Sequence, residues 1–198
     1  MSEHYYTAYP TSESRTRAFS VQIRGVDLRF HTDSGLFSKA ALDEGTRILI
    51  EFLPELTGHV LDMGCGWGAI GTAIAAAMPQ TLVTMTDINE RAVSLARTNL
   101  TLNHVTADVF CGDGFLPVAG RAFSAVVMNP PIRAGKEVMY GLFREARSYL
   151  IPGGSLYLVI RKKQGADSAF RFLNGVFQSV RVMKKSGGYA VIEAATAP

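Results

Sequence analysis

The sequence lacks several features that would place it in a specialised class of protein. Only two of its 198 residues are cysteines. Cys65 sits within a glycine-rich loop that a disulfide with Cys111 would distort, so we expect two free thiols in a reducing compartment. The four histidines are scattered, and no spacing is typical of a metal site. No apolar run approaches the ~20 residues of a membrane span, and no secretory signal is visible at the N-terminus. We therefore expect a cytoplasmic protein without a bound metal.

An excess of charge of one sign is also missing. The net charge is +3 and the isoelectric point is about 8.9, which permits a nucleic-acid partner but does not require one. With 47% hydrophobic and 19% charged residues, the chain can bury a sizeable core. Its length suits one domain. We expect a single domain over 1–198, in which an N-terminal arm, hairpin and helix (1–57) pack on a core (58–198).

Strands alternate with helices from residue 58 onward, which predicts an α/β fold with a mainly parallel sheet and helices on both faces. The closing two strands are joined by a hairpin-like turn, so one edge should be antiparallel. The N-terminal part predicts a β-hairpin over 19–31 and a helix over 39–53 with Ser38 as its N-cap. The expected core strands are 59–62, 81–86, 106–111, 123–128, 155–161, 177–184 and 188–194, and the expected core helices are 67–77, 89–102, 136–150 and 167–175.

A glycine-rich loop follows the first core strand. Gly64, Gly66 and Gly68 alternate after that strand and precede a helix, a pattern that lets a ligand approach the backbone at the helix N-terminus. The stretch 66–71 also fits G-x-G-x-x-G, a weak signal that permits NAD(H). Asp62 before the glycines disfavours a pyrophosphate and favours a ligand that carries an amine or a sulfonium.

Polar residues stand at the ends of four expected strands, where ligands bind in open α/β sheets. They are Asp62, Asp87, Asp113 and Asn129. Asp87 suits the two hydroxyls of a ribose, and either Asp87 or Asn89 could also cap the next helix. Asp113 could face the exocyclic amine of a purine with Phe115 as an apolar wall, or could be an ordinary turn residue.

The stretch Asn129-Pro130-Pro131-Ile132 is the most informative in the chain. Two prolines cannot extend a sheet, so the strand must stop at Met128 and a stiff turn must follow. The Asn129 side-chain oxygen and the Pro130 carbonyl could accept the two N–H groups of a planar amine. They would then orient its lone pair toward a methyl donor and offset the developing positive charge. The simpler alternative is an Asx-type cap before the prolines.

Together these motifs resemble class I S-adenosylmethionine-dependent methyltransferases that modify amine nitrogens, and in particular small bacterial relatives of the rRNA guanine-N2 methyltransferases of the small subunit. The resemblance spans about 4–195. It implies a Rossmann-like, seven-stranded sheet with one antiparallel strand, and Asn129 and Pro130 as catalytic residues. It also implies S-adenosylmethionine as cofactor, bound by Phe37, Asp62, Gly64, Cys65, Gly66, Gly68, Asp87, Ile88, Asp113, Gly114, Phe115 and Asn129.

The resemblance implies RNA, such as rRNA or a ribosomal particle, as the partner. The implied substrate-binding residues follow the ends of two strands: Pro131, Ile132, Arg133, Lys136, Arg161, Lys162 and Lys163. The basic ones could contact phosphates or could simply be solvated charges. Trp67 is expected to support the core.

Two features depart from the family pattern. Many amine methylases carry an aromatic residue where Ile132 stands, and the larger rRNA enzymes carry an additional N-terminal domain. Because the same Asn-Pro-Pro chemistry serves adenine N6 and the glutamine side-chain amide, these remain alternative acceptors. An NAD(H)-dependent oxidoreductase and a non-catalytic RNA-binding module are the alternatives from other classes.

Overall fold

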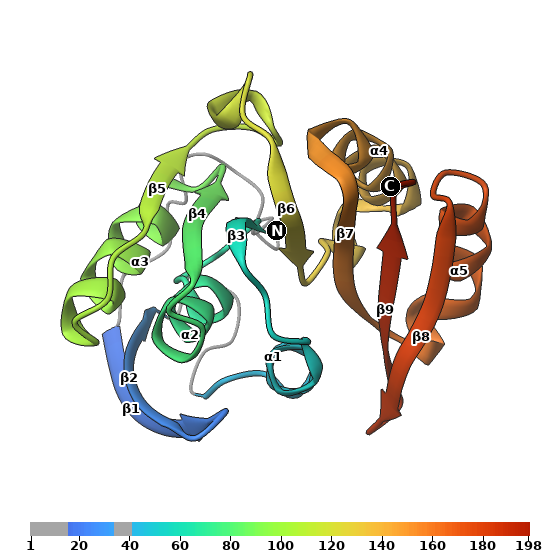
Figure 1. Ribbon diagram of the computed structural model, residues 1–198. Helices are drawn as coiled ribbons and strands as arrows, with labels where there is room; N and C mark the ends of the chain where they lie inside the picture. Colours follow the sequence, from blue (N-terminus) through green and yellow to red (C-terminus); the bar gives the residue numbers. More distant parts are fainter. Residues whose placement is uncertain (1–15, 34–40) are drawn as a thin grey trace.

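The structure, a computed structural model, describes residues 16–33 and 41–198. Within them a seven-stranded sheet has the order β5-β4-β3-β6-β7-β9-β8 (Figure 1). The strand β9 is antiparallel to both of its neighbours, and the other neighbouring pairs are parallel. This confirms the predicted Rossmann-like fold with one antiparallel strand. The strands are β3 Gly58–Met63, β4 Thr81–Asp87, β5 Asp108–Cys111, β6 Phe123–Met128, β7 Leu150–Arg161, β8 Ser179–Ser186 and β9 Tyr189–Ala195.

Two hydrophobic cores lie on opposite faces of the sheet. One lies beneath α1 (Glu44–Phe52), α2 (Ala69–Ala77) and α3 (Glu90–Leu102), and the other beneath α4 (Lys136–Tyr149) and α5 (Ala166–Asn174) (Figure 1). Three short 3-10 helices complete the described chain: η1 Leu116–Val118, η2 Ile132–Ala134 and η3 Lys162–Gln164. Because buried parallel strands need cover on both faces, this arrangement explains the continuous apolar runs of the central strands.

The N-terminal hairpin, β1 (Thr16–Ile23) with β2 (Val26–Asp33), packs against α2 and α3. Phe30 and Trp67 meet edge to face with their ring centroids 5.0 Å apart, which places Trp67 in the core as expected. The buried Asn99 side chain of α3 accepts from the His31 backbone and donates to the carbonyls of His31 and Trp67. The hairpin is therefore tied to the glycine loop through one amide side chain.

The first helix differs from the prediction. It begins at Glu44, and Asp43 is its N-cap, since the Asp43 side chain accepts from the backbone N–H groups of Gly45 and Thr46. Both Asp and Ser cap helices well, so composition alone did not distinguish the two starts. The predicted cap, Ser38, lies outside the described residues.

Most other elements follow the prediction within two residues. The exceptions are β7, which already begins at Leu150, and the N-terminal hairpin, whose strand β1 begins at Thr16. Helix α2 starts two residues later than predicted, at Ala69, because Gly68 has a left-handed φ of 86°. The predicted helix-cap role near the start of α3 belongs to Asn89, whose side chain accepts from Arg91 and Ala92.

Candidate functional site

A cavity of about 460 Å³ opens beyond the carboxyl ends of β3, β4 and β6. This is where parallel α/β sheets bind ligands, since the strand order reverses there. The sequence-predicted residues along its wall come from four separate loops. They are Gly64, Cys65, Gly66, Asp87, Ile88, Asp113, Gly114, Asn129, Pro130 and Pro131.

The three alternating glycines serve two purposes. Gly64 and Gly66 have φ values of 68° and 55°, and a Cβ at either position would meet no atom within 4 Å. Because both line the cavity, a ligand could approach their backbone closely. Gly68 is different: a Cβ there would lie 2.9 Å from Cβ of Ala96, so its glycine is required for packing α2 against α3.

Asp62 is fully buried behind the glycine loop. Its Oδ2 accepts from the Gly71 N–H at 2.8 Å, which gives α2 the N-terminal side-chain cap that Gly68 cannot supply. Its Oδ1 has no partner among the described residues. Burial, reinforced by nearby Asp87, raises the pKa of Asp62 to about 7 despite the Gly71 hydrogen bond. Asp62 does not itself line the cavity, so in this structure it supports the loop from behind.

Asp87 ends β4 at the cavity wall. One carboxylate oxygen accepts from Gly66 N–H at 2.8 Å and the other from Asn89 N–H at 2.9 Å. Burial raises the pKa of Asp87, while these backbone hydrogen bonds oppose the shift. Each oxygen retains a further lone pair, so the side chain can still accept from a ligand hydroxyl.

Asn129 lines the cavity directly after β6. Its Nδ2 donates to Thr46 Oγ1 at 3.0 Å and makes a longer contact of 3.5 Å with Asp43 Oδ2. Both partners belong to the start of α1, and both line the cavity. The amide nitrogen is therefore occupied by the protein.

The proline pair forms a tight turn. The Ile132 N–H donates to the Pro130 carbonyl at 2.9 Å, and Pro131 has φ −76° and ψ 75°, the geometry of an inverse γ-turn. The Pro130 carbonyl thus has one partner and keeps a second lone pair. As predicted, β6 stops at Met128.

Several predicted site residues do not line the cavity. Phe115 is fully buried and stacks on Tyr149 at a centroid distance of 4.7 Å, so its ring is part of the core and forms no wall of this cavity. Ile132 packs against the core beneath α4. The basic residues Arg133, Lys136, Arg161, Lys162 and Lys163 are all exposed, outside the cavity wall. Phe37 lies outside the described residues.

Sequence reasoning missed the residues that α1 and α4 bring to the wall. Asp43 and Thr46 come from α1, whereas Ala134, Val138 and Leu142 come from the segment after the prolines. Asp43 could have been found, because an Asp three residues before a Thr-containing apolar run is a plausible helix cap. Nothing in the sequence signals that Thr46 meets Asn129.

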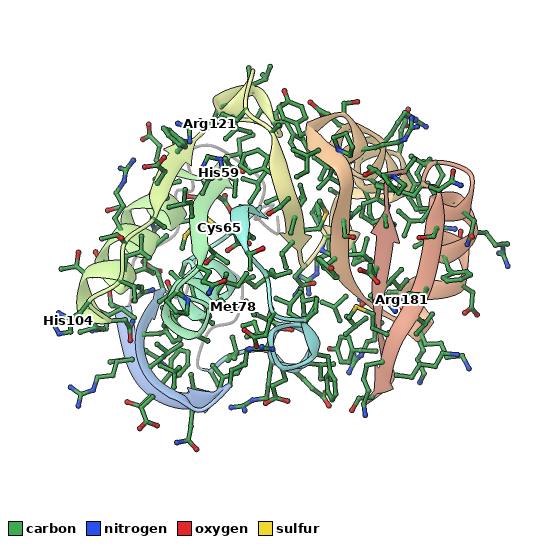
Figure 2. The ribbon with its side chains drawn as sticks, viewed as in Figure 1. His59, Cys65, Met78, His104, Arg121 and Arg181 are labelled. Atoms are coloured by element: carbon green, nitrogen blue, oxygen red, sulfur yellow. The ribbon has the colours of Figure 1, made fainter. Side chains whose placement is uncertain are left out.

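Neither a metal centre nor a membrane helix is found in the described part of the chain. No group of three His, Cys, Asp or Glu side chains there could hold a metal ion, and none of its helices is long and apolar enough to cross a membrane. Cys65, near the centre of the molecule in Figure 2, is buried and Cys111 is exposed; both are free thiols. Burial raises the pKa of the Cys65 thiol, so it is a poor nucleophile in this environment.

The chain matches the methyltransferase small domain family over residues 27–193. It belongs to that family. This confirms the predicted class I methyltransferase assignment, and S-adenosylmethionine is the methyl donor of the class. The match favours methyl transfer over the oxidoreductase alternative.

Individual relatives agree with the family assignment. The uncharacterized protein YbxB of Bacillus subtilis (strain 168) is 41% identical over 98% of both chains. The ribosomal RNA small subunit methyltransferase C of Pseudomonas putida (strain W619) is 31% identical over 92% of this chain and 55% of the relative. The chain thus spans about half the length of the methyltransferases C that it matches.

A solved structure is also similar. It is the T. thermophilus 16S rRNA N2 G1207 methyltransferase (RsmC) in complex with AdoMet and guanosine. The TM-score is 0.83 at 26% identity, with 96% of this chain and 52% of that chain covered.

The cavity of this chain suits S-adenosylmethionine. The space beside Gly64 and Gly66 is open, so a ligand can lie close to the protein backbone there. Asp87 offers acceptors for hydroxyl groups. Of the residues predicted to bind the cofactor, Gly64 to Gly66, Asp87, Ile88, Asp113 and Gly114 line this cavity.

Proposed function

We propose that this protein transfers a methyl group from S-adenosylmethionine to an exocyclic amine, and that the amine is guanine N2 of rRNA. The observation that carries the proposal is the position of Asn129 and Pro130 on the wall of the same cavity as the glycine loop. When bound, S-adenosylmethionine supplies an electrophilic methyl group. The protein must then bind a flat amine and hold its lone pair toward that group.

The residues after β6 can meet this requirement. With the Nδ2 of Asn129 occupied by Thr46, its Oδ1 is the atom left to accept an N–H from the acceptor amine. The free lone pair of the Pro130 carbonyl can accept the second N–H. Two acceptors would stabilise the positive charge that grows on the nitrogen during attack. No ionised base is needed before the methyl group moves.

Exposed basic residues near the cavity support RNA as the acceptor molecule. Arg133 and Lys136 follow β6, and Arg161 to Lys163 follow β7. Since β6 and β7 are parallel neighbours, these exposed cations lie at the same edge of the sheet as the cavity. Lys and Arg side chains at such an edge can position an RNA through its phosphates. The rRNA relatives support guanine N2 over adenine N6 or a glutamine amide.

The test combines a cellular and a purified-protein measurement. Nucleosides from rRNA of a deletion strain, analysed by mass spectrometry, should lack one N2-methylguanosine that the wild-type gene restores. A strain that lost only a methyladenosine or a protein methylglutamine would identify one of the alternative acceptors.

In vitro, small ribosomal subunits from the deletion strain should accept tritiated methyl groups from wild-type protein. The Asn129→Ala variant should bind S-adenosylhomocysteine normally and lose turnover by at least about 100-fold. Asn174→Ala, the same change at an exposed position of α5, is the matched control and should remain active. Full turnover by Asn129→Ala would remove the proposed role of its amide.

A further inference from the structure

The start of α1 meets the acceptor wall of the cavity through a pair of polar side chains. Thr46 is 6% exposed, and its hydroxyl oxygen accepts from Asn129 Nδ2 at 3.0 Å. Asp43 Oδ2 lies 3.5 Å from the same nitrogen. We infer that Asp43 and Thr46 are positioning residues: Asp43 fixes which end of the Asn129 amide faces the acceptor amine, and Thr46 anchors that amide in place. This inference rests on the proposed methyl transfer to a planar amine.

The Asp43 carboxylate is itself held in one orientation. Its Oδ1 accepts from Gly45 N–H at 3.0 Å and from Thr46 N–H at 3.3 Å, as the N-cap of α1. These bonds leave Oδ2 to point toward Asn129. A carboxylate oxygen can only accept hydrogen bonds. The amide must therefore present its NH2 group to Asp43 and its oxygen elsewhere.

The first turn of α1 is also fixed by the far edge of the sheet. A Cβ on Gly45 would lie 2.8 Å from Cε1 of Tyr189, and a Cβ on Gly187 would lie 2.2 Å from Oε1 of Glu44. The turn between β8 and β9 thus packs directly on this turn of helix. The Tyr189 ring leaves no room for a side chain at position 45, so the first turn of α1 lies close against the start of β9.

The orientation of this amide decides whether the site can bind an amine. Oxygen and nitrogen of a carboxamide occupy nearly the same space, so a half-turn exchanges an acceptor for a donor at no steric cost. With Oδ1 toward the acceptor amine, an N–H of that amine finds a partner. With the amide reversed, two donors would face each other and the amine would not be held for attack. The Asp43 carboxylate, which can only accept, selects the productive orientation, whereas the Thr46 hydroxyl, which can donate or accept, anchors the amide against the first turn of α1.

Four variants test this inference. Thr46→Val keeps the volume and removes the hydroxyl, and Thr46→Ser restores it. Asp43→Asn retains Oδ1 as the helix cap but places a donor opposite the Asn129 NH2. The control is Thr72→Val, the same chemical change in a buried residue of α2 whose hydroxyl has no hydrogen-bond partner in the described part of the chain.

The first measurement is kinetic, with small ribosomal subunits from deletion cells and tritiated S-adenosylmethionine. Asp43→Asn should lower kcat about 10- to 100-fold, because the Asn129 amide can then reverse, and Thr46→Val about 10-fold, because the amide loses its anchor. KM for the subunits and the Kd for S-adenosylhomocysteine should stay within about 2-fold. The variants do not change the contacts that bind substrate equally well before and during methyl transfer. Thr46→Ser should recover kcat to within about 3-fold, and Thr72→Val should match wild type.

The second measurement does not depend on turnover. The side-chain NH2 signals of Asn129, identified by their loss in Asn129→Ala, should be protected from hydrogen exchange in the wild type and unprotected in Thr46→Val. If the wild type transfers no methyl group to the subunits, the proposed rRNA function fails, while the exchange data still test the orientation of the amide. Unchanged kcat and unchanged protection in Thr46→Val would overturn the inference, as would a kcat loss that Thr46→Ser does not restore.

Discussion

The two sides of the cavity are assembled over very different distances in the chain. The side proposed to bind the cofactor (the cofactor side), Gly64 to Gly68 with Asp87, is held by contacts within one β-α-β unit, such as the bond from Gly66 N–H to Asp87 Oδ2. The side proposed to bind the acceptor (the acceptor side), Asn129 to Pro131, is held by a helix 83 residues earlier through Thr46. On the first side a side chain binds nearby backbone, whereas on the second side two side chains from distant segments bind each other. Substitutions on the acceptor side should therefore lower turnover, whereas substitutions on the cofactor side should alter stability or cofactor affinity.

The largest effect is expected on the acceptor side. Asn129→Asp would set a second carboxylate about 3.5 Å from Asp43 Oδ2 and would remove the donor to Thr46. We expect turnover to fall by about 1,000-fold, because like charges repel and the amide geometry is lost. S-adenosylhomocysteine affinity, measured by calorimetry, should change little. Asn174→Asp serves as the surface control. Equal losses of affinity and turnover would erase the distinction between the two sides.

Gly68→Ala should produce the next largest effect, this time on folding. The new Cβ would lie 2.9 Å from Cβ of Ala96 at a residue with φ 86°. Left-handed strain and overpacking together should lower the free energy of unfolding by about 3 kcal/mol, as measured by urea denaturation. Gly120→Ala shares a positive φ of 79° but meets no atom within 4 Å, so it should cost only about 1 kcal/mol. Similar costs for the two variants would contradict a packing role for Gly68.

The pH dependence of stability should report the burial of Asp62. Its pKa rises from 3.8 to about 7 on folding. At a pH between these two values, the folded state keeps the Asp62 proton and the unfolded state has released it. The free energy of unfolding should therefore fall as pH rises, by roughly 2 kcal/mol between pH 5 and pH 7, and level off above pH 7. Asp62→Asn should abolish this component. A wild-type profile parallel to that of Asp62→Asn would show that Asp62 stays ionised throughout.

The smallest effect is expected from Gly64→Ala. The added methyl group would meet no protein atom but would stand at the cavity wall, where φ is 68°. We expect the Kd for S-adenosylhomocysteine to rise about 10-fold, equivalent to about 1.4 kcal/mol, with a minor loss of stability. Gly25→Ala has a φ of 76° in the open turn of the N-terminal hairpin and should leave the Kd unchanged. An unaffected Kd in Gly64→Ala would place the cofactor elsewhere.

Most residues of the cofactor side could be predicted from the sequence. Strand, glycine loop and helix follow one another within a short stretch, and continuous apolar runs predict where each strand ends. Asp87 and Asp113 were therefore expected at the edge where the cavity opens, and they line it. The direction of a side chain was harder to predict, because the sequence does not show whether Phe115 faces a ligand or the core. It lies in the core, stacked on Tyr149.

Local sequence patterns determined the order of strands and helices, the glycine loop and the end of β6 at the prolines, because each depends on the backbone limits of a few neighbouring residues. Only the tertiary structure decided that Gly68 packs on Ala96, that Asp62 caps α2 from behind, and that Thr46 holds Asn129. These contacts join residues that no periodicity relates. They exist because folding the sheet brings distant segments within hydrogen-bonding distance.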